Sequence, residues 1–347
     1  MVLIFSLSAC GGGDSSGNPD VRSEVLTVDQ FLYTEPKAKT EYHTEVSAEK
    51  LQALISIFSN GNQPDGYQAN YFKVIYENTN LPQNAIHITN SKNTKLLIYN
   101  HGHGGLPVSA EVFAKRLIQI SLDQGFDILL TSMPLVGLNS IDDDIAYWAN
   151  MYGSSRPAIL DKKLISPWAH AHGVYEAIDD HNHYMHFFID SAVIFASLTS
   201  SVENTLARRF FHVNAPAAIY DRISYVGLSG GAATGLTACA VFAFDKCILV
   251  AGLLPFYLRA ENIKSWGDAE QVSRSFYSMF SYEYLMQLAG NKSNKVLYIY
   301  NRHDPCCYAD PEATKFQRDF PQYDIRVVDS DTHGFDELLI MSELSQD

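Results

Sequence analysis

Positive charge, cysteine and long apolar runs are all scarce in this chain. Its 347 residues carry 25 Lys and Arg against 39 Asp and Glu, and the net charge of −14 argues against nucleic acid as a partner and favours a soluble monomer. Beyond the N-terminal residues, no apolar run approaches the ~20 residues that a membrane-spanning helix needs. The five cysteines include no Cys-x2-Cys pair, which disfavours a structural zinc site. What remains is the composition of an ordinary globular protein.

The first nine residues have the pattern of a processing signal. Residues 2–5 form an apolar core, and Leu7-Ser8-Ala9-Cys10 is a Leu-small-small-Cys box before a Gly/Ser-rich stretch. This pattern resembles a bacterial lipoprotein signal, which implies cleavage after residue 9 and a lipid on Cys10. We therefore expect a tether over residues 10–25 and an exported protein, lipid-anchored to the periplasmic or cell-surface face of a bacterial membrane. An ordinary secretory signal or an apolar disordered tail is the alternative.

Four further cysteines are available for disulfides: Cys239, Cys247, Cys306 and Cys307. Export permits disulfide formation, and four cysteines allow three pairings. A bond between the adjacent Cys306 and Cys307 would be strained, so we expect at least one of them to pair elsewhere, with Cys247 as a candidate. Reduced, buried thiols are an equally favoured alternative.

Short β-favouring runs alternate with helical patterns through most of the chain. The order strand, helix, strand implies right-handed crossovers in a mostly parallel sheet within one α/β domain over residues 26–347. Strands are predicted at 71–76, 85–89, 95–99, 126–130, 223–226, 246–251, 295–301 and 324–328, the first two as a hairpin. Helices are predicted at 47–60, 112–122, 184–198 and 311–320, and a second irregular excursion at 252–290.

One strand of this series ends in Gly227-Leu228-Ser229-Gly230-Gly231 and is followed by a helix of small residues. A strand, then Gly-x-Ser-x-Gly, then a helix is the context of a nucleophile elbow, which presents the serine hydroxyl at the top of the sheet. The helix N-terminus directs a partial positive charge towards that serine. We therefore predict Ser229 as a nucleophile; a plain glycine turn is the alternative.

The strand at 95–99 runs into Asn100-His101-Gly102-His103-Gly104-Gly105. Glycines after a core strand let the backbone approach a substrate, so that an N–H group can stabilise a developing oxyanion. We predict the backbone N–H groups of His103 and Gly230 as the two oxyanion donors. The side chain of His101 is predicted to hold this loop rather than to act as a base.

Two later strands are each followed by a candidate partner for the serine. Asp304 follows the strand at 295–301 and is the predicted acid, with Asp310 as a second candidate; His333 follows the strand at 324–328 and is the predicted base. Because parallel strands end at one edge of a sheet, Ser229, Asp304 and His333 are expected to converge there. A turn carboxylate and a loop histidine are the structural alternatives for these two residues.

Together these motifs resemble the α/β-hydrolase superfamily from about residue 71 to the C-terminus. Within it, the Gly-x-Ser-x-Gly-Gly elbow is similar to that of esterases, including acetyl-xylan-esterase-like and dienelactone-hydrolase-like proteins. The resemblance implies the α/β-hydrolase fold, with a mostly parallel central sheet and helices on both faces. It also implies a serine carboxylesterase that needs no cofactor and acts on small-molecule or polysaccharide-linked esters through an acyl-Ser229 intermediate.

The segment 141–186 interrupts the alternation and matches no pattern of the superfamily. A loop this long is usually functional, and we interpret it as a cap or lid insertion. Its histidines admit a metal-binding alternative, and with it a non-catalytic surface protein on the same fold. An exported peptidase resembling prolyl oligopeptidases is a further alternative, although no propeller-like repeat precedes the domain. The histidines are His170, His172, His181, His183 and His186.

Overall fold

The computed structural model describes eleven stretches of the chain: residues 27–33, 38–43, 66–76, 83–90, 92–102, 112–134, 137–139, 183–202, 211–213, 216–259 and 269–346. The predicted signal and tether with Cys10, the expected helix at 47–60, His103 and most of the segment 141–186 lie outside these stretches. None of the described helices is both long and apolar enough to cross a membrane.

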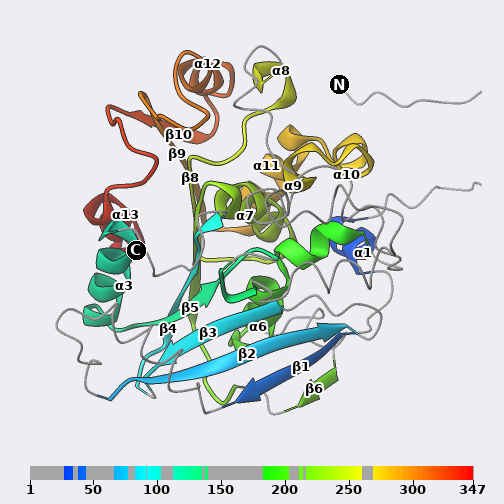
Figure 1. The fold of residues 1–347 in the computed structure, drawn as a ribbon, viewed down its shortest axis with the longest axis vertical. Coiled ribbons are helices and arrows are strands. Elements are labelled where there is room, and N and C mark those ends of the chain that lie inside the picture. Colours follow the sequence, from blue (N-terminus) through cyan, green and yellow to red (C-terminus); the bar gives the residue numbers. More distant parts are fainter. Residues whose placement is uncertain are drawn as a thin grey trace, which may run out of the picture.

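A single mixed sheet organises the described chain (Figure 1). Neighbours are parallel from β10 to β5 and antiparallel from β5 to β1, and the short β6 runs parallel to β1. The predicted mostly parallel sheet is therefore confirmed, and the predicted hairpin, β2 and β3, lies in its antiparallel part. In spatial order the strands are β10 (Asp324–Val328), β9 (Lys295–Asn301), β8 (Lys246–Val250), β7 (Arg222–Leu228), β4 (Lys95–Asn100), β5 (Phe126–Thr131), β3 (Gln83–Thr89), β2 (Gln68–Tyr76), β1 (Ala38–His43) and β6 (Phe211–Val213).

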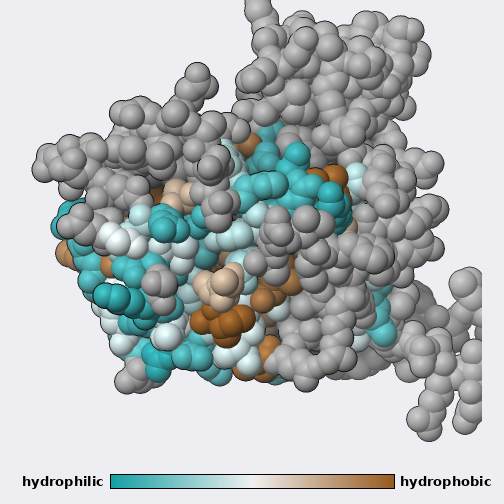
Figure 2. Space-filling view, turned by 90° about the horizontal axis from the view of Figure 1, so that it is seen from below, coloured by the Kyte–Doolittle hydropathy of each residue, from teal (hydrophilic) through white to brown (hydrophobic). Residues whose placement is uncertain are grey.

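Burial along the strands explains this arrangement. The central strands β5 and β8 are buried at every residue, as expected for parallel strands covered by helices on both faces. Strand β2 instead alternates between buried and more accessible residues, the pattern of a strand with one covered face. The molecule is seen from the β1–β2 side in Figure 2, where hydrophilic residues separate small hydrophobic patches on the described surface.

Helices cover both faces of the sheet, as predicted. On one face, Leu97 and Tyr99 of β4 pack with α3 (Val112–Asp123) and α13 (Glu337–Ser345). On the other, Leu96 and Ile98 belong to the cluster that contains α6 (Asp190–Thr199), α7 (Gly230–Val241) and α11 (Tyr282–Lys292). Alternate residues of one strand thus serve two cores on opposite faces of the sheet.

Several elements differ from the sequence prediction. The expected helix at 184–198 is a 3-10 turn, η5 (Tyr184–Phe188), followed by α6. The excursion at 252–290 is largely helical where it is described, and its last helix, α11, packs on α7. Helix α13 and the short α1, β1 and β6 were not predicted. The remaining short elements are α1 (Val28–Leu32), η3 (Gly137–Asn139), α8 (Phe256–Arg259), α9 (Ala269–Val272), α10 (Arg274–Met279) and α12 (Glu312–Asp319).

The disulfide expectation was wrong. Cys239 of α7 is bonded to Cys247 of β8, while Cys306 and Cys307 are not disulfide-bonded. Cys247 is the second residue of β8, whereas Cys306 and Cys307 come after the end of β9. Because β8 and β9 are parallel, these positions lie at opposite ends of the strands and cannot meet. Helix α7 packs directly on β8, and its Cys239 Cα lies 6.5 Å from that of Cys247, within the range of a disulfide.

A buried carboxylate ties the strands of the sheet to their loops. Asp127 of β5 is fully buried and accepts hydrogen bonds from the Thr89 hydroxyl (2.5 Å), the Asn90 N–H (2.8 Å) and the Asn93 amide (2.8 Å). The Tyr220 hydroxyl donates a fourth, at 2.6 Å. A buried charge is tolerated only when it is satisfied in this way, so the network fixes the end of β3 against β5 and the start of β4.

The same network holds His87 as a neutral side chain. Tyr220 donates to Asp127, so its oxygen accepts from His87 Nε2 (2.7 Å), and Tyr42 donates to Nδ1 (2.9 Å). His87 Nε2 also lies 4.0 Å from the Asp127 carboxylate. Burial is complete, and it lowers the pKa of His87 to about 3.

His87 should make the folded state sensitive to acid. In the unfolded chain it titrates near 6.5, so below that pH the unfolded state binds more protons and the free energy of unfolding falls. Between pH 6.5 and 4.5 we expect His87 to remove about 2–3 kcal/mol. Urea unfolding of the wild type and of His87→Gln at both pH values measures this, because the variant lacks the titrating group. Equal pH dependence in the two proteins would contradict the assignment.

Candidate active site

Ser229 occupies a strained turn between β7 and α7. Its φ is +58° and its ψ −125°, a combination that a residue with a β-carbon rarely adopts and that costs about 1–3 kcal/mol. The Ser229 N–H donates to the carbonyl of Val250 at 2.9 Å, which ties the turn to the end of β8. The Ser229 carbonyl accepts from the first turn of α7. This is the backbone geometry of the nucleophile elbow that the sequence predicts.

The loop after β4 packs against this elbow, backbone to backbone. A β-carbon on Gly231 would lie 2.3 Å from the carbonyl oxygen of Asn100. Gly102 has a φ of +82°, and a β-carbon there would lie 2.6 Å from the Leu228 carbonyl oxygen and 2.8 Å from the Gly230 nitrogen. The loop therefore lies at the N-terminus of α7. The first N–H groups of a helix have no acceptor within the helix, so they are available there as hydrogen-bond donors.

His101, the first histidine of this loop, has the structural role predicted for it. It is buried, and its Nδ1 lies 2.7 Å from the hydroxyl of Tyr99. Burial, together with the smaller effect of the nearby charge of His333, lowers the pKa of His101 to about 4. The ring of Tyr99 in β4 lies 6.1 Å from that of Phe335, so the end of β4 and the loop carrying His333 lie close together. The predicted donor His103 is outside the described residues.

Asp304 and His333 form a hydrogen-bonded pair. His333 Nδ1 lies 2.8 Å from Asp304 Oδ2 and 3.1 Å from Oδ1, with the Asp304 side chain 1% exposed and that of His333 24% exposed. The Asp304 Oδ1 also accepts the backbone N–H groups of Cys306 (2.8 Å) and Cys307 (3.4 Å). The carboxylate is therefore fixed from two sides, and it directs Nε2 of His333 away from itself.

Asn301, which the sequence analysis did not single out, holds the His333 loop in place. It is the last residue of β9, and its side-chain amide donates to the carbonyls of Thr332 and Gly334, each at 2.7 Å. These two residues flank His333. No sequence motif marks Asn301, but its position three residues before the candidate acid is a signal that could have drawn attention.

The second candidate acid has other partners. Asp310 forms an ion pair with Arg302 and accepts hydrogen bonds from the Thr314 N–H (3.0 Å) and hydroxyl (2.6 Å). Asp310 is therefore tied to the beginning of α12. It is Asp304 that makes the hydrogen bond to His333.

Two histidines of the segment 141–186 are described, and both have structural partners. His186 is fully buried, and its Nδ1 lies 2.7 Å from Asp190. His183 caps η5 and lies 2.8 Å from the Ser275 hydroxyl. His170, His172 and His181 lie outside the described residues, so the metal-binding alternative is not supported by the two that are described.

Comparison with known proteins bears on the fold. No family model matches the chain, and no curated protein matches it significantly. Among solved structures, acetyl xylan esterase 1 from Thermoanaerobacterium sp. JW/SL YS485 is similar over 92% of this chain and 91% of that chain, at 17% identity and a TM-score of 0.51. The Pyrococcus furiosus esterase Pf2001 covers 80% of this chain and 89% of its own, at 13% identity and a TM-score of 0.45.

The similarity to the acetyl xylan esterase agrees with the architecture described above. At such low identity, the similarity to the acetyl xylan esterase shows the fold alone. The chain has the α/β-hydrolase fold, with a mostly parallel sheet and helices on both faces. The α/β-hydrolase expectation for the architecture is therefore confirmed.

Gly231→Ala tests the contact between the elbow and the loop after β4. The new methyl group would meet backbone atoms of Asn100, which cannot rotate away, so we expect a loss of about 2–3 kcal/mol in the free energy of unfolding. Gly290→Ala in α11 is the matched control: its β-carbon meets nothing within 4 Å, and alanine favours the helix by about 0.5–1 kcal/mol. Urea unfolding measures both. Equal stability of the two variants would contradict the close approach.

Proposed function

We propose that this protein is a serine hydrolase that cleaves acyl esters through a covalent acyl-Ser229 intermediate. One observation carries the proposal: a strained Ser229 and a hydrogen-bonded Asp304–His333 pair follow strands that end at the same edge of one parallel sheet. The similarity in fold to an acetyl xylan esterase is consistent with it and is an argument by analogy for the substrate.

In this mechanism His333 accepts the proton of the Ser229 hydroxyl. Asp304 binds Nδ1 of the imidazole, so Nε2 is the nitrogen that faces the reaction. The buried carboxylate keeps the correct tautomer in the resting enzyme and stabilises the imidazolium once the proton has moved. Ser229 then attacks the ester carbonyl, and His333 returns the proton to the leaving alcohol. Water then hydrolyses the acyl-enzyme by the same steps, with water as the nucleophile and Ser229 as the leaving group.

The oxyanion of the tetrahedral intermediate is proposed to bind the N–H groups of Gly230 and His103. Gly230 is the first residue of α7, and Gly102 brings the loop after β4 to its nitrogen. Each such donor is typically worth about 3–4 kcal/mol of transition-state stabilisation. These steps require no cofactor. The proposed substrates are small-molecule or polysaccharide-linked acyl esters.

Covalent labelling with a fluorophosphonate tests the nucleophile. We expect a single adduct on Ser229 of the full-length protein, located by mass spectrometry, and none in Ser229→Ala. Asp304→Asn should slow labelling and the turnover of short-chain esters by about 10⁴-fold, because the asparagine amide can donate to Nδ1 and hold the imidazole in the tautomer that cannot accept the Ser229 proton. Asp310→Asn is the matched control and should change both rates little, since Asp310 contacts Arg302 and Thr314 instead of His333.

Three outcomes would count against the proposal. Full ester turnover by Ser229→Ala would show that Ser229 is not the nucleophile. Equal effects of Asp304→Asn and Asp310→Asn would show that Asp304 is not the catalytic acid residue. Peptide cleavage faster than ester cleavage by the purified wild type would replace the esterase with a peptidase of the same chemistry.

We also propose that the protein is exported and anchored through a lipid on Cys10, on the basis of the Leu7-Ser8-Ala9-Cys10 box. Metabolic labelling with a clickable fatty acid in a bacterial host should mark the wild type and leave Cys10→Ala unmarked. Cys306→Ser is the control, because it removes a different cysteine. Equal label on wild type and Cys10→Ala would contradict the anchor.

A further inference from the structure

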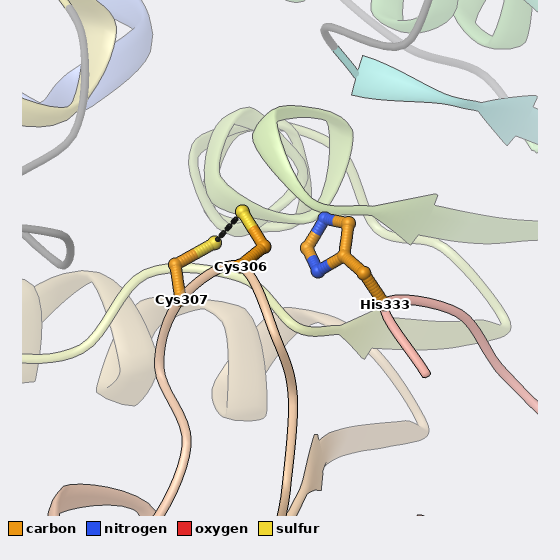
Figure 3. A group of neighbouring side chains, drawn as sticks. All are labelled: Cys306, Cys307 and His333. Atoms are coloured by element: carbon orange, nitrogen blue, oxygen red, sulfur yellow. Dashed lines mark hydrogen bonds between the residues drawn. The ribbon is translucent and has the colours of Figure 1, made fainter. Parts of the chain in front are cut away.

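Two thiols lie beside the imidazole that the proposed mechanism uses. Cys306 and Cys307 follow Asp304 in the loop after β9, and their sulfur atoms are 2.7 Å apart without forming a disulfide. Both sulfurs and a ring nitrogen of His333 lie within 4.8 Å of one another. Figure 3 shows the two sulfurs side by side, with Cys306 next to the imidazole ring.

The thiol groups are not needed for the contacts that hold the Asp304–His333 pair. Asp304 is bound by the backbone N–H groups of Cys306 and Cys307, which almost any residue at these positions would supply. Nor do the two cysteines serve the disulfide of the fold, which joins Cys239 to Cys247. The pair of sulfurs beside His333 therefore calls for another explanation.

Two thiolates and one imidazole are a ligand set for zinc and other thiophilic divalent cations. In a tetrahedral zinc site with Zn–S distances near 2.3 Å, the two sulfurs are about 3.8 Å apart. The observed separation of 2.7 Å thus has to open by about 1 Å, which rotation of the side chains can supply. Cys306 is exposed and Cys307 partly so, and an ion can reach them from solvent.

The existing hydrogen bonds determine which nitrogen of His333 would bind the metal. Nδ1 is bound to Asp304 at 2.8 Å, so Nε2 is the ligand atom. A carboxylate on the other nitrogen is the usual partner of a metal-bound histidine, because it orients the ring and raises its basicity. Nε2 is also the atom that accepts the Ser229 proton in the proposed mechanism, and it cannot bind a metal and a proton together.

We propose that Cys306, Cys307 and His333 form an inhibitory site for a thiophilic divalent cation, which on binding withdraws Nε2 of His333 from Ser229. Binding displaces the two thiol protons to solvent and leaves the fourth coordination position to water. The metal site itself stands on the three side chains, whereas its inhibitory effect rests on the proposed hydrolase function.

Cobalt binding tests the site without reference to activity. The full-length protein is reduced with a phosphine, freed of metal with a chelator and titrated with Co²⁺, whose bonds to thiolates give an intense near-ultraviolet charge-transfer band. We expect this band to reach its maximum at one equivalent and to disappear on addition of Zn²⁺. Cys306→Ser/Cys307→Ser should abolish the band, and His333→Ala should weaken cobalt affinity by at least about 10-fold. His303→Ala, which removes an exposed neighbouring imidazole, should change neither.

Inhibition is measured as the ratio of fluorophosphonate labelling rates without and with Zn²⁺, taken within each protein so that differences in basal rate cancel. We expect stoichiometric Zn²⁺ to slow the wild type by at least about 10-fold, a chelator to restore it, and the double cysteine variant to have a ratio near one. Absence of the cobalt band in the reduced wild type, or equal zinc inhibition of the double variant, would overturn the proposal. A cobalt band in a protein that is never labelled would support the metal site while contradicting its inhibitory role and the hydrolase function.

Discussion

The structure depends on the close backbone packing around Ser229. The residue has a strained φ of +58°, and this conformation persists because the contacts around the turn hold it in place. Its N–H donates to the carbonyl of Val250 at the end of β8, and its own carbonyl accepts the first hydrogen bonds of α7. The loop after β4 packs on Gly230 and Gly231 with backbone atoms in direct contact. Three parallel strands and one helix are thereby fixed at a single point.

The parallel sheet then decides which distant residues can meet. Strands β7, β9 and β10 are parallel and end at the same edge, so residues separated by about a hundred positions in sequence are brought to one edge of the sheet. Within that edge, polar contacts provide the finer positioning. Asn301 binds both residues that flank His333, and backbone N–H groups hold Asp304 against the imidazole. The strands place the loops, and these hydrogen bonds orient the side chains within them.

Much of this arrangement could be predicted from sequence, for physical reasons that also define where prediction stops. The buried central strands are apolar runs, and the elbow needs glycines at fixed spacing, so both leave a local signal. Two of the missed elements leave little local signal because they are short: β6 has three residues, and α1 has five. The disulfide was predicted wrongly although the predicted strands could have excluded it, because Cys247 is at the start of the strand at 246–251 and Cys306 follows the end of the parallel strand at 295–301. Asn301 acts through its tertiary contacts, and the only local signal for it is its position three residues before Asp304.

In the loop after β9, the backbone and the side chains of Cys306 and Cys307 have different roles. The carboxylate of Asp304 is held by main-chain donors of Cys306 and Cys307, so these positions could carry almost any residue without disturbing that contact. Sulfur at both positions, within 4.8 Å of the same imidazole, therefore adds a chemical property that the Asp304–His333 pair does not require. A nitrogen that must accept a proton is equally able to accept a metal ion, since both use the same lone pair. Placing two soft ligands beside it couples the reactivity of His333 to the supply of such ions.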